Sequence, residues 1–341
     1  MKIGVNYLAE VKELIEEGKL DFLNYIKLYS LNNDLSPLSW CLQHRWVMFH
    51  GTIGQASRFA DKDLIKNTDV EETIKVLKAT KAPYISCHIA SREEVSLDEM
   101  LENIKNNVRD FKNAFGYDIA LENIPYRSYY DCCVELTRPE IISKIVYDND
   151  IMFLFDISHA RSSANHWGMT LEEYVSKLPM DRVVELHLAG MYDFPNVNDA
   201  KIASKYTPKQ IQFVKEQIKK YGKRADAHGK MNEEDYRFLE EAIKKYPSLK
   251  YVTLEYGSYN GGADGYSDED YTYPVCHYDR INPVVKEEVL EQLTRIKNIV
   301  DTNDAEWKSW VIEIVMNDCY IVRKRFWGVQ VLSLSLSRKH F

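Results

Sequence analysis

Up to about residue 300, the sequence alternates short apolar runs with charged segments of helical periodicity. This pattern predicts a (β/α)8 barrel, a TIM barrel, which normally takes about 250 residues or more. We therefore expect a barrel domain over residues 1–300 and a C-terminal extension over residues 301–341. The eight apolar runs that are rich in β-branched and aromatic residues, as strands are, are Ile3–Asn6, Phe22–Ile26, Trp46–Phe49, Tyr84–Cys87, Ile119–Leu121, Met152–Phe155, Val183–Leu186 and Val252–Leu254.

Helices are expected between most of these strands and in one insertion. The segments with helical periodicity are Val11–Glu17, Asp69–Thr80, Leu97–Phe115, Pro139–Tyr147, Leu171–Lys177 and Asn232–Tyr246. A further helix is predicted over Thr207–Tyr221, because Thr207 is a suitable N-cap and Pro208 fits the first helical position. In the extension, Trp310–Met316 and Tyr320–Val331 have the composition of strands, so an appended β-hairpin is one arrangement that they allow.

Composition narrows the class of protein. A chain of 341 residues that is 45% hydrophobic can bury a large core. It contains no apolar run of about 18 residues that would span a membrane and no signal-peptide core, so we expect a cytoplasmic protein. The six cysteines lack CxxC spacing, which agrees with a reducing compartment. The formal net charge of −8 argues against a broad polyanion-binding surface, so nucleic acid is not the expected partner.

Side chains that can bind metal follow six of the eight predicted strands directly: His50, His88, Glu122, Asp156, His187 and Glu255. The first five follow one another at intervals of 31 to 38 residues, about one strand–helix unit each. In a barrel, the carboxyl ends of all strands meet at one rim, where active sites lie. Three more candidates are His159 and, before the last strand, Asp226 and His228, whose spacing of two lets both point the same way from an extended segment.

The expected ligand set therefore holds five histidines and four carboxylates. A single catalytic metal commonly takes three or four protein ligands, so nine indicate two or three ions that share bridging carboxylates. Imidazole and carboxylate without thiolate suit iron, zinc or manganese. In the alternative interpretation, some of these side chains are hydrogen-bonded structural groups, and Asp156 caps the following helix.

These strand-end segments resemble the multinuclear non-haem iron-dependent oxidative enzymes, which modify ribosomally made peptides and include the methanobactin-forming oxidase. The resemblance covers about residues 1–300. Its most specific pieces are His-Leu-Ala-Gly at 187–190 and Asp-Ala-His-Gly at 226–229. The chain departs from the family pattern at Ser158 and His159, where many members carry two asparagines, and the second strand lacks the glutamate often seen there.

The resemblance implies a dioxygen-using oxidation of a precursor peptide at a cysteine, with two or three iron ions. Glu122, Asp156 and His187 would be catalytic, the two carboxylates would bridge ions, and Asn123 would support a ligand. The residues expected to face substrate are Asn123, Asn165, Tyr256 and Tyr259. The family also implies a separate peptide-recognition partner protein.

A second resemblance leaves another function open. The ligands from Asp156 to Glu255 also look like the trinuclear zinc site of apurinic endonucleases on the related xylose-isomerase-like barrel, which makes a zinc-dependent endonuclease or phosphodiesterase the alternative. His-Leu-Ala-Gly in place of a His-x-x-Asp pattern, together with the acidic balance, favours the oxidative family. A sugar isomerase or epimerase with one or two divalent ions is the third possibility, because fold alone does not determine function.

Overall fold

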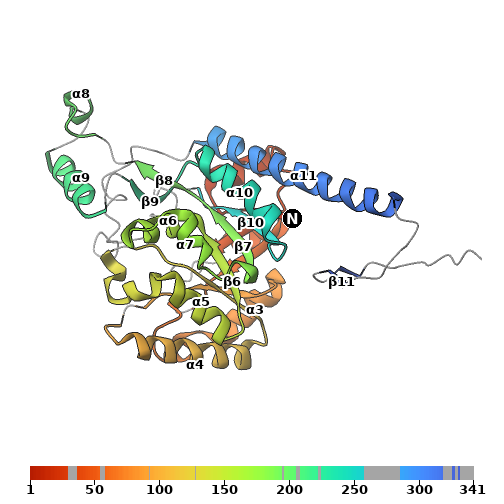
Figure 1. Cartoon of the computed structure of the whole chain (residues 1–341), viewed down its shortest axis with the longest axis horizontal. Helices are drawn as coiled ribbons and strands as arrows, with labels where there is room; N and C mark the ends of the chain where they lie inside the picture. Colours follow the sequence, from red (N-terminus) through yellow and green to blue (C-terminus); the bar gives the residue numbers. More distant parts are fainter. Residues whose placement is uncertain are drawn as a thin grey trace, which may run out of the picture.

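The barrel predicted from the sequence is present in the computed structural model of the chain (Figure 1). Some side chains within the described ranges, among them those of residues 221, 224–227 and 304–317, are not described. The described ranges are 1–29, 37–53, 58–91, 93–126, 128–193, 196–204, 208–221, 224–256, 285–317, 325–326 and 329–330.

Eight parallel strands close into the barrel. All eight predicted strands are confirmed, but the fourth is displaced by one residue and the second by three. The second begins at Tyr25 instead of Phe22, because Leu23 and Asn24 form a turn whose backbone N–H groups donate to Leu20 and Ile3. In spatial order around the barrel, the strands are β1 Lys2–Asn6, β10 Tyr251–Leu254, β7 Val183–Leu188, β6 Met152–Asp156, β5 Ile119–Glu122, β4 Ile85–His88, β3 Trp46–His50 and β2 Tyr25–Tyr29.

Helices surround this barrel, and each of the seven predicted helices is present. Helices α2, α6, α8 and α11 were not predicted. The helices are α1 Ala9–Glu16, α2 Leu38–His44, α3 Val70–Thr80, α4 Leu97–Phe115, α5 Pro139–Asp148, α6 Ile157–His166, α7 Leu171–Ser176, α8 Ala200–Ala203, α9 Pro208–Tyr221, α10 Glu233–Lys245 and α11 Lys286–Asn317, with 3-10 turns η2 Leu64–Asn67, η3 Ser128–Thr137 and η4 Met180–Arg182.

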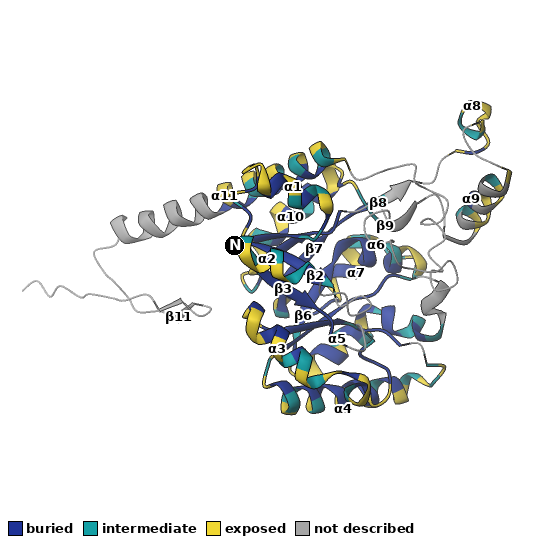
Figure 2. Cartoon of the chain, turned by 180° about the vertical axis from the view of Figure 1, so that it is seen from behind, coloured by how far each residue is buried: buried dark blue, intermediate teal, exposed yellow. Residues whose placement is uncertain are grey.

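The core lies between the strands and the inward faces of these helices (Figure 2). Helix α4 shows how the sequence produces this arrangement. Ser96 caps its first turn by accepting from the Glu99 N–H, and Gly116 ends it at a φ of 67°. Between these ends, one stripe of the helix is buried, from Met100 through Val108 to Phe115, while its other faces carry charge.

The C-terminal extension differs from its predicted structure. Helix α11 runs through residues 300 and 301, so the expected domain boundary falls inside a helix. The predicted strand Trp310–Met316 is wrong, because these residues continue that helix; a short apolar run does not by itself distinguish strand from helix. Strands β11 Arg325–Phe326 and β12 Val329–Gln330 pair antiparallel. Among the described residues, no helix is long and apolar enough to cross a membrane.

Candidate metal centre

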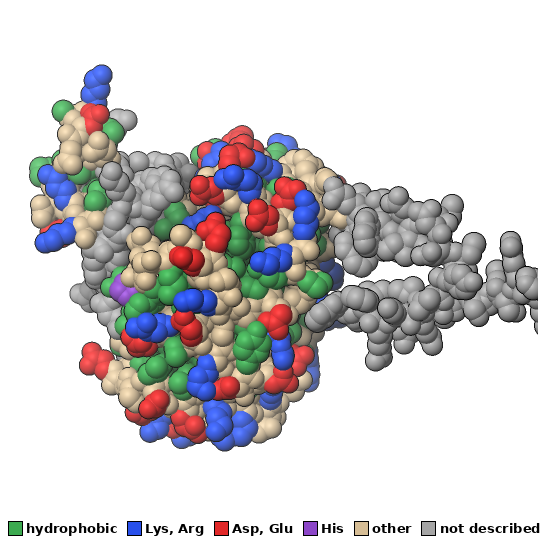
Figure 3. Space-filling model, viewed as in Figure 1, with side chains coloured by type: hydrophobic (Ala, Val, Ile, Leu, Met, Phe, Trp, Pro, Cys, Tyr) green, Lys and Arg blue, Asp and Glu red, His purple; other side chains and the backbone are tan. Residues whose placement is uncertain are grey.

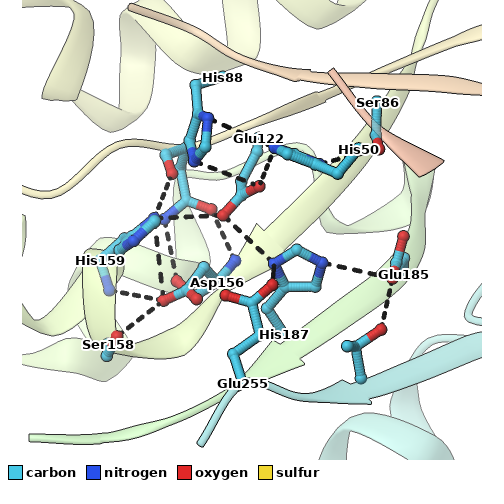
Figure 4. Close-up of polar contacts among 12 residues, drawn as sticks. His50, Ser86, His88, Glu122, Asp156, Ser158, His159, Glu185, His187 and Glu255 are labelled. Atoms are coloured by element: carbon cyan, nitrogen blue, oxygen red, sulfur yellow. Dashed lines mark hydrogen bonds and ion pairs between the residues drawn. The ribbon is translucent and has the colours of Figure 1, made fainter. Parts of the chain in front are cut away.

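The predicted strand-end side chains do meet at one rim of the barrel (Figure 4). Glu122, at the end of β5, lies centrally and faces side chains from both directions. On one side are His50 and His88 from β3 and β4. On the other side are side chains carried by β6, β7 and the residue after β10. Two groups of ligand atoms result, and Glu122 belongs to both.

The first group consists of His50, His88 and Glu122. Oε2 of Glu122 lies 3.5 Å from Nε2 of His50 and 3.6 Å from Nε2 of His88. Ser86 fixes the His50 ring from the other side, with its Oγ 2.9 Å from Nδ1. Ligands that bind one ion at about 2.0–2.2 Å lie roughly 3–3.5 Å apart, so these side chains have nearly the separation that a shared ion requires.

The second group consists of Glu122, Asp156, His187 and Glu255, all of them buried. Nδ1 of His187 lies 3.3 Å from Oε1 of Glu122 and 2.8 Å from Oε1 of Glu255. One ligand atom from each of the four side chains lies within 4.8 Å of the others. The two oxygens of Glu122 therefore face different groups, which is the arrangement of a bridging carboxylate.

Buried oxygens in this centre lack hydrogen-bond donors. Both carboxylate oxygens of Glu122 and Oδ2 of Asp156 have no hydrogen-bond partner among the described residues, although both side chains are at most 1% exposed. Leaving buried anionic oxygens without donors is costly unless a cation compensates them. The donor set therefore fits metal ions with nitrogen and oxygen ligands.

The protonation equilibria of the protein groups agree with this interpretation. Burial lowers the pKa of His50 well below its usual range and that of His88 to about 4, so both rings are neutral and offer a lone pair. Burial opposes ionisation of Glu122, but His88 and His187 outweigh it and hold its pKa well below the usual range. Burial raises the pKa of Glu255 to about 8, and the charge of Lys27 offsets only part of that rise.

Asp156 has both of the roles considered from the sequence. Its Oδ1 accepts from the N–H of His159 at 2.7 Å and caps helix α6. This cap explains why α6 follows β6 without a loop. Asp156 also belongs to the second group, and its Oδ2 has no hydrogen-bond partner among the described residues, so Oδ2 is the oxygen left for a cation. Asn123, fully buried, exchanges two hydrogen bonds with the Asp156 backbone, of 2.8 and 2.9 Å, so it braces that strand end.

His159 approaches the centre from helix α6. Its Nδ1 lies 2.8 Å from the Asn123 carbonyl oxygen, which can only accept, so this nitrogen carries the ring proton. Nε2 is then the nitrogen that can bind a cation. The His159 ring centroid is 6.0 Å from that of His88 and 6.2 Å from that of His228, so the side chain stands between the strand-end ligands and the inserted segment.

His228 lies on the β8–β9 hairpin, a two-stranded antiparallel sheet outside the barrel whose strands, β8 Gly190–Asp193 and β9 Arg224–Gly229, are separated in sequence by helices α8 and α9. Strand β8 pairs antiparallel with β9 and brings Nδ1 of His228 to 3.6 Å from Oε2 of Glu255. The backbone of His228 has a φ of 51°, a conformation that non-glycine residues adopt mainly where the surrounding structure imposes it. Asp226 lies in β9, and its side chain is outside the described residues.

The two most specific sequence motifs meet in this hairpin. Gly190 from the His-Leu-Ala-Gly segment pairs with Gly229 from the Asp-Ala-His-Gly segment. A Cβ on Gly190 would lie 1.9 Å from the carbonyl oxygen of Lys230, so only glycine permits this approach. The motifs are therefore two halves of one structural unit that holds His228.

The residues expected to face substrate lie in different surroundings. Asn165 is exposed near the end of helix α6. Tyr256 is buried, and its hydroxyl donates to Oε2 of Glu288 at 2.6 Å, which ties it to helix α11. Tyr259 lies outside the described residues.

Sequence reasoning missed three polar residues of the barrel interior. Lys27 and Tyr29 belong to β2, whose predicted range ended at Ile26, three residues before the strand ends, and Glu185 lies inside an otherwise apolar strand. The hydroxyl of Tyr29 donates to Oε1 of Glu255. The sequence signal that could have found them is the two-residue period of a strand. Lys27 lies two residues from both Tyr25 and Tyr29, and Glu185 lies two residues before His187, so in each strand these residues share the face that points into the barrel.

Known proteins similar to this chain were found by sequence. Residues 38–250 match the family model described as RiPP precursor modification enzyme MbnB/TglH/ChrH. A UPF0276 protein of Acaryochloris marina (strain MBIC 11017) is 27% identical over 94 residues, and one of Paraburkholderia phytofirmans (strain DSM 17436 / LMG 22146 / PsJN) is 29% identical over 90 residues. These alignments cover 27% and 26% of this chain and about a third of each relative, 33% and 29%.

A solved structure supports the fold. A xylose isomerase domain-containing protein from Salmonella typhimurium LT2 superposes with a TM-score of 0.51 at 13% sequence identity. The superposition covers 87% of this chain and 96% of that protein. The xylose-isomerase-like barrel expected from the sequence is therefore confirmed.

Proposed function

The chain belongs to the family of RiPP precursor modification enzymes, and on that premise we propose that it is a multinuclear iron enzyme that uses dioxygen to oxidise a ribosomally synthesised peptide at a cysteine. The observation that supports this most directly is Glu122, a carboxylate that is buried between two groups of ligands and whose oxygens have no hydrogen-bond donor among the described residues. Iron bound there would supply the redox chemistry with dioxygen. Zinc or manganese would suit the same donor types.

The protein's own residues would bind the ions and fix their positions. His50, His88 and Glu122 would bind one ion, and Asp156, His187 and Glu255 would complete the other with the second oxygen of Glu122. Because all but His88 are buried, these ligands face a site from which bulk water is largely excluded. Nε2 of His159 and the side chain of His228 would serve a third ion, for which Asp226 is the expected carboxylate.

The alternative functions gain no support from these observations. A zinc-dependent endonuclease and a sugar isomerase or epimerase share the barrel fold, but fold alone does not select among them. On the face shown in Figure 3, acidic and basic side chains of the described residues are intermixed, which does not favour a phosphate backbone as ligand. A cytoplasmic location and a separate peptide-recognition protein remain part of the proposal.

Metal analysis of protein purified without oxygen tests this function. We expect two or three irons per chain, and oxygen uptake with a synthetic peptide that contains one cysteine but not with the same peptide carrying serine. Glu122→Gln should lose most of the iron, because it removes the shared carboxylate. Glu172→Gln, the same change at an exposed position, should retain it. Zinc in place of iron, together with cleavage of abasic DNA, would refute the proposal.

A further inference from the structure

A buried lysine lies directly beneath the candidate metal centre. Lys27 is 0% exposed, and its Nζ lies 2.7 Å from Oε1 of Glu185 and 2.6 Å from Nε2 of His187. Three alternate residues of strand β2 point into the barrel interior: the Tyr25 hydroxyl is hydrogen-bonded to Thr253, the Tyr29 hydroxyl donates to Glu255, and Lys27 lies between them. Lysine is rarely buried without a specific partner.

Glu185 is the partner that this lysine neutralises, and its hydrogen bonds are satisfied. Its Oε1 accepts from Nζ of Lys27 and, at 2.5 Å, from the hydroxyl of Thr253. Its Oε2 accepts from the hydroxyl of Tyr84 at 2.7 Å. This contrasts with Glu122, whose oxygens have no donor within the described ranges. Glu185 is therefore held below the centre by hydrogen bonds from the protein, whereas both oxygens of Glu122 face the candidate ligands.

The position of Glu185 matters because it faces the back of a candidate ligand. His187 directs Nδ1 toward Glu122 and Glu255, and its Nε2 lies 3.3 Å from Oε1 of Glu185. Nε2 also lies 2.6 Å from Nζ of Lys27, which can only donate, so the ring must change tautomer when Nδ1 binds a cation. Nε2 then carries the ring proton, Lys27 keeps its bond to Glu185, and Oε1 of Glu185 is the acceptor within reach of Nε2. Histidine ligands are commonly oriented by a carboxylate in this way, and loss of such support typically weakens metal binding about 10- to 100-fold.

We propose that Lys27 is a positioning residue of the metal centre: it holds Glu185 on the floor of the barrel, so that Glu185 orients His187 and does not itself become a metal ligand. This inference rests on the proposed function, because it presupposes ions at the rim. Four buried carboxylates, of Glu122, Asp156, Glu185 and Glu255, lie within or directly below the centre. Lys27 compensates the one that the ions do not reach.

Two variants separate positioning from structural support. Lys27→Met leaves Glu185 as an uncompensated buried charge, so it should lower the thermal midpoint in chelator and weaken iron binding about 10- to 100-fold. The double variant Lys27→Met/Glu185→Gln removes both charges. It should recover much of the midpoint but not the iron affinity, since the glutamine amide is a poorer acceptor for His187. Iron affinity is measured anaerobically against a competing chelator, with Lys66→Met, the same change at an exposed lysine, as the control.

The outcomes distinguish this inference from the function on which it rests. If the wild type binds iron, Glu122→Gln abolishes binding, and a folded double variant binds iron as the wild type does, Lys27 has no positioning role. If the wild type itself binds no iron, the proposed function fails. A crystal structure of the iron-loaded wild type decides independently of whether the variants fold. We expect Lys27 to remain on Glu185, with Glu185 within hydrogen-bond distance of Nε2 of His187; Glu185 as an iron ligand would overturn the inference.

Discussion

Asp156 illustrates, at the scale of one residue, how a side chain can have two roles. One oxygen accepts a backbone N–H at the start of helix α6, and the other has no donor in the part of the chain that the structure describes. A capping carboxylate and a ligand are usually treated as competing interpretations of a polar residue after a strand. Here the two oxygens divide these roles, because the strand end and the helix start coincide at one residue.

Two substitutions of Asp156 should separate these roles. Asp156→Asn retains an oxygen that can cap the helix but loses the anionic ligand, so we expect near wild-type stability in chelator and loss of iron from the second group. Asp156→Ala loses both and should also lower the free energy of unfolding by about 0.5–2 kcal/mol. Metal analysis and urea denaturation measure the two effects. Equal iron content in wild type and Asp156→Asn would exclude the ligand role.

The hairpin of β8 and β9 is the element that brings a ligand from outside the barrel. Its close approach depends on glycine, since a Cβ at Gly190 would collide with the backbone at Lys230. The distance along the sequence between the two motifs is therefore bridged by backbone pairing, and His228 reaches Glu255 only when that pairing is correct.

Gly190→Ala tests this hairpin. The added methyl group should push β9 away from β8 and move His228 from Glu255, with a partial loss of iron. The helix content should change little, because the hairpin lies outside the barrel. Metal analysis and circular dichroism check the two expectations. Retention of all bound iron by the variant would show that the hairpin does not position a ligand.

Helix α11 is held to helix α1 by an ion pair that depends on pH. Lys286 donates to Glu17 at 2.8 Å and to Glu13 at 2.9 Å, and hydrogen bonds from Lys19 and Lys286 lower the pKa of Glu17 to about 2. Because this pKa is depressed in the folded chain, the stabilisation is present above the usual glutamate pKa, near 4.5, and is lost as the pH falls toward 2.

Replacing Lys286 should therefore lower the stability at pH values above the usual glutamate pKa and change it little at low pH. We expect Lys286→Ala to be slightly less stable than wild type at pH 6 and to approach it at pH 3, and high salt should reduce the difference because the groups are exposed. Urea denaturation at the two pH values measures it. A difference that grows as the pH falls would contradict the assignment.

At the scale of the whole molecule, bound metal and folding should be coupled. The ligands come from six barrel strands or their ends and from the hairpin, so an ion that binds them connects segments distant in sequence. An ion at a concentration 100 times its dissociation constant adds about 2.7 kcal/mol to the stability of a folded protein that alone binds it.

Chelation should thus lower the thermal midpoint of the wild type by several degrees. Glu122→Gln, lacking the shared carboxylate, should show little change on chelation, and Glu172→Gln should behave as the wild type. Differential scanning calorimetry with and without chelator provides the measurement. An identical midpoint for the wild type under both conditions would indicate that no ion stabilises the fold.

The sequence by itself determined the barrel and the rim. Strand and helix periods are local properties, and the ends of parallel strands necessarily converge, so His50, Glu122 and Asp156 could be placed at one rim without coordinates. The β8–β9 hairpin and four helices were not placed in this way. Helix α6 shows one reason: it begins directly after β6, so no loop residues mark its start in the sequence.

Only the tertiary structure decided which side chains share which partners. Lys27 and Glu185 are 158 positions apart, and nothing local couples them until the barrel closes. The same closure places Glu122 between two groups of ligands, where its oxygens find no donor among the residues that the structure describes, whereas those of Glu185 are satisfied. The two glutamates are alike in sequence, each inside or at the end of an apolar strand. Their different environments, a compensating lysine for one and none for the other, arise from burial and distance across the barrel, which no sequence period encodes.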